Sequence, residues 1–133
     1  MKCAAYVRTA SSEHSESSLS MQVKAIEEYI KNKNWQLCKI YKEENSLGPE
    51  LNVGLQRAIN DAKEEKVDVI ISVTASRLFR YYKQATHLQG LCEQQKVDII
   101  TLDNCINTFE GKYGLIHSPL SSINSIGFLY DKK

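Results

Sequence analysis

The chain opens with a short, continuous apolar run followed by a longer segment of mixed polarity. Lys2 to Arg8 is strand-like, with apolar residues from Cys3 to Val7, and Ser20 to Asn34 then places Val23, Ile26 and Ile30 on one helical face with charges on the other. A short apolar run is typical of a buried strand, whereas apolar residues every three or four positions are typical of an amphipathic helix. The first 34 residues therefore predict a strand followed by a helix.

The same order of elements repeats along the chain. We expect strands at 35–41, 67–73 and 97–102, a turn-rich stretch at 43–49, and helices at 53–66 and 80–95. The positions expected to face the core are Leu55, Ala58, Ile59 and Ala62 in the first of these helices, and Tyr81, Ala85, Leu88 and Leu91 in the second. Parallel strands need crossover helices, so this alternation predicts an α/β fold with three layers, a mostly parallel central sheet and helices on both faces.

The pattern weakens after Thr108, where glycines and a proline interrupt it. Ser118 followed by Pro119 resembles an N-cap and a first helical position, which predicts a short helix at about 119–129. We therefore expect a domain over residues 1–108 and an irregular tail over 109–133.

Length, charge and hydropathy favour a single globular domain over a membrane protein or a highly basic nucleic-acid binder. A length of 133 residues fits one compact domain, and a net charge of +1 gives no overall field that would mark a nucleic-acid binder. Any contact with DNA must then come from a local patch. We find no apolar run of membrane-spanning length and no signal peptide, so we expect a cytoplasmic protein without a membrane partner.

The four cysteines are far apart and form no C-x-x-C pair. Their spacing favours buried free thiols for at least Cys3, Cys38 and Cys92 over metal ligands or disulfides. The three histidines are equally scattered. We expect no metal and no other cofactor.

Arginines follow two of the predicted strands. Arg8 ends the first strand, before a hydroxyl-rich stretch at 9–20, and Arg77 and Arg80 follow the strand at 67–73. Ligands of open α/β sheets bind outside the carboxyl ends of the strands, so these guanidinium groups predict a phosphate or another anion there. The alternative is that they are solvated arginines paired with acids. Ser18 and Ser20 can likewise be simple helix caps.

Five short motifs occur in one order. They are Tyr6-Val7-Arg8, Ser18-Leu19-Ser20-Met21-Gln22, Tyr41-Lys42-Glu43-Glu44 with Gly48, Gly54-Leu55-Gln56-Arg57, and Ser76-Arg77-Leu78-Phe79-Arg80. Each motif is weak alone. Together, over roughly residues 1–108, they resemble the catalytic domain of the serine recombinases, the resolvase/invertase family that also includes the large serine integrases.

The resemblance implies site-specific DNA strand exchange, in which a serine attacks a DNA phosphodiester without a metal or cofactor. By position, Arg8, Arg77 and Arg80 match the phosphate-binding arginines, and Gln22 matches a residue that helps to order the active site. Glu43 falls where the family usually has an aspartate. The implied partners are DNA and further copies of the same chain, although the long dimerisation helix of the family is not evident here.

The expected nucleophile position, two residues after Arg8, holds Ala10, whose methyl group cannot attack phosphorus. His14 also stands where the family usually has glutamine. Three explanations remain open: Ala10 is an engineered substitution, Ser11 or Ser12 is a displaced nucleophile, or catalysis has been lost. A shift of one residue near a strand end turns the side chain to the other face, which counts against Ser11.

Three functions therefore compete. The first is a serine-recombinase catalytic domain that binds a DNA phosphate and has its nucleophile missing or displaced. The second is a non-catalytic, recombinase-like protein that acts as an interaction or regulatory partner. The third is an unrelated α/β domain that binds anions. On the plainest interpretation, Gln22 is an exposed helical residue and Glu43 and Glu44 are loop acids.

Overall fold

The computed structural model describes residues 1–9, 15–44 and 52–109. The elements, in chain order, are β1 (Lys2–Thr9), α1 (Ser15–Lys33), β2 (Gln36–Glu44), α2 (Val53–Glu65), β3 (Val69–Ser72), the 3-10 turn η1 (Ala75–Arg77), α3 (Tyr82–Gln95) and β4 (Asp98–Thr101). This order confirms the predicted alternation of strands and helices. The tail after Phe109, including the helix expected at 119–129, lies outside the described residues, and the division of the chain at residue 108 stays a prediction.

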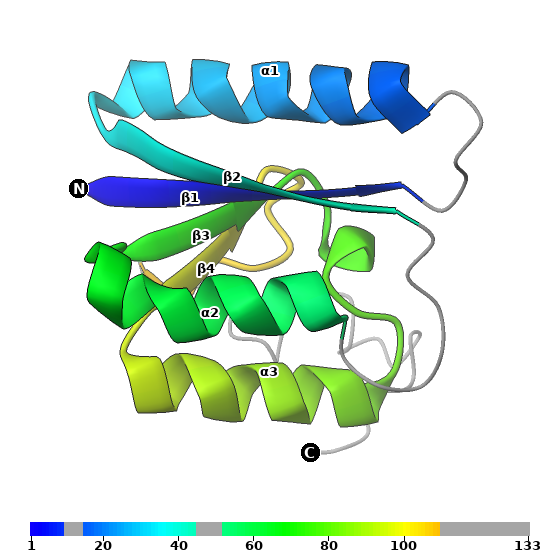
Figure 1. Ribbon diagram of the computed structural model, residues 1–133, viewed down its shortest axis with the longest axis vertical. Helices are drawn as coiled ribbons and strands as arrows, with labels where there is room; N and C mark the ends of the chain where they lie inside the picture. Colours follow the sequence, from blue (N-terminus) through cyan, green and yellow to red (C-terminus); the bar gives the residue numbers. More distant parts are fainter. Residues whose placement is uncertain (10–14, 45–51, 110–133) are drawn as a thin grey trace.

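The strands form one four-stranded sheet in the order β2-β1-β3-β4, and every neighbouring pair is parallel. Helix α1 covers one face of the sheet, and α2 and α3 lie side by side on the other (Figure 1). The predicted three-layer α/β architecture is therefore confirmed. Each crossover returns the chain to the amino edge, so the carboxyl ends of β1 and β3 meet at one edge of the sheet.

The core lies on both faces of β1, whose residues from Cys3 to Thr9 are all buried. Ala5 and Val7 pack against the α1 side, with Ile26 and Ile30. The alternate positions of β1 pack against the α2 and α3 side, in a cluster of buried residues that includes Ala4, Tyr6, Leu55, Ile59, Ile70 and Leu88. A strand covered on both faces needs apolar residues along most of its length, which explains the continuous apolar run from Cys3 to Val7.

Each helix is followed by a residue in the left-handed conformation. These residues are Asn34 (φ 62°), Lys66 (φ 58°) and Lys96 (φ 57°). The backbone N–H of Val67 then donates to Ala62 O (2.8 Å), and that of Val97 donates to Cys92 O (3.1 Å). The left-handed residue ends the helix abruptly, so that no more than three residues separate each of these helices from the next strand.

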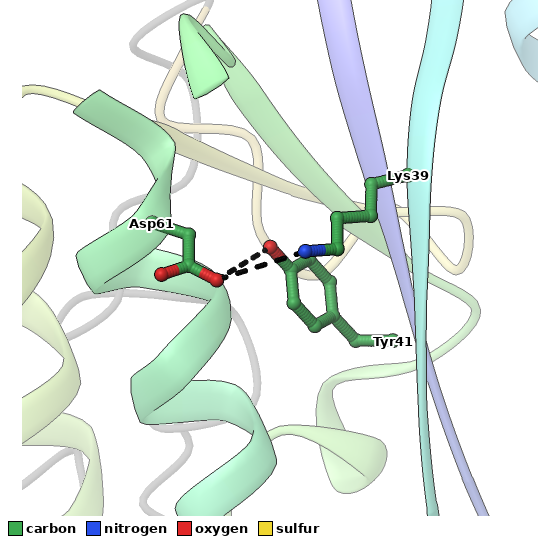
Figure 2. A network of polar contacts seen from close by, with 3 residues as sticks. All are labelled: Lys39, Tyr41 and Asp61. Carbon is green, nitrogen blue, oxygen red and sulfur yellow. Dashed lines mark hydrogen bonds and ion pairs between the residues drawn. The ribbon is translucent and has the colours of Figure 1, made fainter. Parts of the chain in front are cut away.

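A polar contact joins α2 to the edge strand β2. The Tyr41 hydroxyl donates to Asp61 Oδ2 (3.1 Å), Lys39 Nζ lies 3.9 Å from the same oxygen, and the ammonium group is 5.0 Å from the centre of the Tyr41 ring. Figure 2 shows both β2 side chains reaching toward Asp61 of the helix. The carboxylate therefore binds α2 to the outer strand, outside the apolar core.

Two predictions of burial were wrong. Tyr81 is 51% exposed, and the neighbouring Tyr82 packs against the core in its place. Cys38 is exposed, whereas Cys3 and Cys92 are buried as expected. None of the four thiols forms a disulfide in the structure.

Two expected boundaries also moved. Because α1 begins at Ser15, Ser18 and Ser20 lie inside the helix and do not cap it. Because β2 continues to Glu44, Glu43 and Glu44 belong to a strand, so their interpretation as loop acids was wrong. Within the described ranges, no helix has the length and apolar character needed to cross a membrane.

Candidate active site

Arg8 and the turn η1 meet at the carboxyl edge of the sheet, because β1 and β3 are neighbours. The Arg8 side chain is folded into the protein, and the residue is only 5% exposed. Its Nε donates to Arg77 O (3.1 Å) and its Nη2 donates to Ser76 O (2.8 Å). The structure thus brings together the two arginine motifs, which are about 70 residues apart in the chain, and Arg8 holds the backbone of the turn that carries Arg77.

Gln22 fixes the end of β1 from the first turns of α1. Its Oε1 accepts from the Arg8 backbone N–H (3.3 Å), and its Nε2 donates to Arg8 O (2.9 Å) and to Ser18 Oγ (3.3 Å). The residue is 6% exposed, so the interpretation as an exposed helical glutamine was wrong. The side-chain amide pairs with the Arg8 backbone as a neighbouring strand would, which aligns the arginine.

Arg77 carries a buried polar atom with no partner in the part of the chain that the structure describes. The residue is half-buried, and its Nε is buried without a hydrogen-bond acceptor among the described parts of the chain. A buried N–H of a charged group is costly to leave unpaired, so this donor is suited to an anion that enters from outside.

Arg80 is exposed, but its backbone is fixed. The amides of Arg80 and Tyr81 both donate to Oε1 of the buried Gln84, at 2.7 and 3.1 Å. Gln84 stands in the first turn of α3, where it satisfies amides that precede the helix. The guanidinium of Arg80 therefore extends into solvent from a defined point on this edge.

Arg77 and Arg80 act electrostatically on Arg8. Burial lowers the pKa of the Arg8 guanidinium, and the positive charges of Arg77 and Arg80 lower it further, against opposing contributions from Tyr6 and Glu43. An arginine remains charged in proteins despite such shifts. Clustered cations that repel one another are stabilised by an anion bound between them.

A second polar layer lies beside the arginines. The Tyr6 hydroxyl donates to Glu43 Oε1 (2.5 Å), and the other Glu43 oxygen accepts from the Gly54 amide (2.9 Å) in the first turn of α2. The Asn52 side chain donates to the Tyr6 oxygen (3.1 Å). Burial, followed by the hydrogen bond and charge of Glu43, raises the pKa of Tyr6. The phenol therefore stays protonated and acts as a donor that orients the carboxylate.

Sequence reasoning missed several of these contacts. Gln84 was not singled out, although a glutamine three residues after Tyr81 at a helix start is a capping signal. The pairing of Glu43 with Gly54 has no signal in the sequence, because it depends on how β2 meets α2. Ala10, Ser11 and His14 lie outside the described residues, so their predicted roles stay predictions.

Arg8, Arg77 and Arg80 place three positive charges at this edge of the sheet, and such a set of groups can bind and partly neutralise a phosphate. The described residues include no group of three or more histidine, cysteine, aspartate or glutamate side chains that could hold a metal ion.

Comparisons with known proteins identify the family of the chain and agree with its fold. The family model for the resolvase N-terminal domain matches residues 3–125. The N-terminal catalytic domain of TP901-1 integrase is 25% identical, with a TM-score of 0.78 and 96% of each chain covered. A search of curated proteins gave no match.

Two further structures share the fold. A resolvase family site-specific recombinase from Streptococcus pneumoniae has a TM-score of 0.72 at 20% identity, over 96% of this chain and 87% of that one. The C-terminal catalytic domain of ISC1926 TnpA, an IS607-like serine recombinase, has a TM-score of 0.65 at 22% identity, over 77% and 70%. Because the family model spans most of the sequence, the chain belongs to the resolvase N-terminal domain family.

Proposed function

We propose that this chain is the catalytic domain of a site-specific DNA recombinase of the serine type, and that Arg8, Arg77 and Arg80 bind the scissile DNA phosphate. The observation that carries the proposal is the buried Arg77 Nε, which has no acceptor among the described residues and lies in the turn that Arg8 holds. A phosphate oxygen is the acceptor that such a site fits, since a guanidinium matches phosphate geometry with two parallel donors.

The reaction is a transesterification. A serine oxygen attacks phosphorus, the bond to the 3′ oxygen breaks, and the 3′ oxygen leaves as a hydroxyl while the 5′ phosphate stays joined to the serine. Negative charge builds up on the pentacoordinate phosphate, and the arginines stabilise it. A weak hydroxyl nucleophile can then react without a metal ion.

Ala10 decides whether this chain can take the attacking role itself. With a methyl group at the expected position, attack requires Ser11 or Ser12. If neither serves, the chain is a recombinase-like protein that binds DNA or active recombinases as a non-catalytic partner. Ala10 is the observation that favours this second function.

DNA is the partner that the first function requires, and a DNA substrate favours the cytoplasm as the compartment. We further propose that residues 1–108 form the catalytic domain and that the chain works as a homo-oligomer, since strand exchange needs one active site for each broken strand.

The chemical test uses supercoiled DNA with a candidate recombination site. The chain, its Ala10→Ser variant and its Ser11→Ala variant are each incubated with DNA and run on denaturing gels to detect a covalent adduct. An adduct from Ala10→Ser alone means an intact phosphate site without its nucleophile. An adduct from the unmodified chain that is lost in Ser11→Ala identifies a displaced nucleophile, and no adduct from any protein favours the non-catalytic partner.

The binding test needs no recombination site. Inorganic phosphate is titrated into the chain, and the NMR signals of the arginine Nε–H groups are followed. Phosphate should move the Arg77 signal, and Arg77→Ala and Arg80→Ala should weaken its binding. Arg57→Ala is the matched control, since Arg57 is exposed on α2. Equal phosphate affinity in all four proteins would overturn the anion site.

A further inference from the structure

The turn η1 is held at its start by a residue that follows β4. The backbone N–H of Ala75, the first residue of η1, donates to Asp103 Oδ2 (3.3 Å). The other carboxylate oxygen, Oδ1, accepts from the Thr101 hydroxyl (2.6 Å) and from the Cys105 amide (3.0 Å). One carboxylate therefore ties the loop after β4 to the turn after β3.

The opposite end of η1 is held by Arg8, through the carbonyl oxygens of Ser76 and Arg77. A short helical turn leaves amides unpaired at its start and carbonyls unpaired at its end. Here a carboxylate satisfies an amide and a guanidinium satisfies the carbonyls. One side chain comes from β1 and the other from the loop that follows β4, and these two strands flank β3 on either side.

From these contacts we infer that Asp103 is a positioning residue for the phosphate site. By fixing the start of η1, it holds Arg77 and the carbonyls to which Arg8 binds in one arrangement, so that both guanidinium groups converge on one phosphate. This inference rests on the proposed function, because the phosphate is the ligand that the arrangement serves.

The burial of Ala75 gives the contact its importance. The residue is 2% exposed, so if the Asp103 carboxylate is lost its amide has little access to water. An unpaired buried amide is destabilising, and the turn can relieve that cost by moving toward solvent. Such a movement would displace Arg77 without unfolding the sheet.

The separate roles of the two oxygens allow a sharp test. Asp103→Asn can keep its oxygen at the Oδ1 position, where it still accepts from Thr101 and Cys105. Its NH₂ group then faces the Ala75 N–H, and two donors cannot pair. Asp103→Ala removes all three bonds. If Asp103 only shapes its own loop, the asparagine variant should behave like the unmodified chain.

Asp98→Asn is the matched control. Asp98 opens β4, and its Oδ1 accepts from the Thr108 hydroxyl (2.8 Å), at the end of the strand opposite to Asp103. The control thus removes the same charge at the far end of β4 without touching η1.

The first measurement is amide hydrogen exchange in the unmodified chain and the three variants, without phosphate. The amides of Arg77 and Leu78 donate to Thr74 O (3.1 Å) and Ala75 O (2.9 Å) within the turn. Relative to Asp98→Asn, both Asp103 variants should exchange these amides about threefold to tenfold faster. Amides in the centre of β1 should be unchanged, which separates local release of the turn from global loss of stability.

The second measurement is the phosphate titration followed through the Arg77 Nε–H signal. Both Asp103 variants should bind phosphate about threefold to tenfold more weakly than Asp98→Asn. Wild-type exchange and wild-type affinity in Asp103→Asn would overturn the inference, whatever Asp103→Ala does. Absence of phosphate binding by the unmodified chain would instead overturn the proposed function, and the exchange data would still decide whether Asp103 positions the turn.

Discussion

Replacing Gln22 with alanine should be among the most damaging single changes in the site. The glutamine amide makes two hydrogen bonds to the Arg8 backbone, at 3.3 and 2.9 Å, and both residues are almost fully buried. Leaving a buried backbone group unpaired costs about 1–3 kcal/mol, so Gln22→Ala should reduce the free energy of unfolding by about 2–4 kcal/mol. That is a large share of the roughly 5–15 kcal/mol that stabilises a typical domain.

The measurement is urea unfolding at 25 °C followed by circular dichroism. Gln94→Ala is the control, because Gln94 is exposed on α3 and its loss should change the unfolding free energy by less than about 0.5 kcal/mol. If Gln22→Ala and Gln94→Ala are equally stable, the amide does not hold the end of β1 as described.

Gln22→Glu tests the direction of the same two bonds. A carboxyl group can accept from the Arg8 N–H and donate to the Arg8 carbonyl only when it is protonated, so folding should raise its pKa. A carboxyl whose pKa is raised on folding stabilises the protein below its unfolded pKa, and this stabilisation is lost as the pH rises through the folded value. The stability difference from the unmodified chain should therefore widen between about pH 4 and pH 7. Equal differences at both pH values would contradict the assigned bonds.

Two further predictions concern the rest of the fold. Gly54→Ala places a methyl group 2.6 Å from Glu43 Oε1 and should lower the free energy of unfolding by about 1–3 kcal/mol. A methyl group at Gly90 meets nothing within 4 Å, so Gly90→Ala should raise the free energy of unfolding by about 0.5–1 kcal/mol. Urea unfolding measures both effects, and equal effects of the two substitutions would contradict the prediction. Burial raises the pKa of Cys3 from 9.0 to about 11 and that of Cys92 to about 12. Because the folded protein favours the protonated thiols, the free energy of unfolding should fall as the pH rises from about 9 toward 12. A urea midpoint that stays constant over that range would show that the thiols do not contribute.

The period of the apolar residues was sufficient to predict the fold. Ile26 and Ile30 in α1, and Leu55 and Ile59 in α2, are buried where helical spacing placed them. Such positions are predictable because they depend on burial of one face of a helix, which the sequence pattern encodes directly. The parallel sheet follows from the alternation itself, since each connection contains a helix.

The wrong predictions fall where a regular period ends. Tyr81 precedes the first residue of α3, so helical spacing does not apply to it and its ring is exposed. Cys38 lies at a register shift, where Cys3 pairs with Leu37 and Ala4 pairs with Lys39. The extra residue interrupts the alternation of the strand, and nothing in the local sequence marks that interruption.

The charged residues of the candidate site could be predicted from the sequence, but the residues that hold them in place could not. Arg8 and Arg77 could be placed together because carboxyl ends of neighbouring parallel strands share an edge. Asp103 and Gln84 could not be linked to them, because their bonds join a side chain to the backbone of a turn. Those bonds depend on the path of two loops, which apolar periodicity does not describe.

The way in which Arg8 is buried explains how a chain with a net charge of only +1 can hold a local site for phosphate. The two Arg8 bonds to η1 go to neutral carbonyl oxygens, which satisfy donors without cancelling the positive charge. The nearby carboxylate of Glu43 is engaged by a tyrosine hydroxyl and a backbone amide. Within the described ranges neither Arg77 nor Arg80 forms an ion pair, so the charges of these two residues remain available to a ligand. On the proposed function, binding of the phosphate and attack on it are therefore separable, and an alanine at position 10 removes the attacking oxygen while leaving the positive charge that binds DNA.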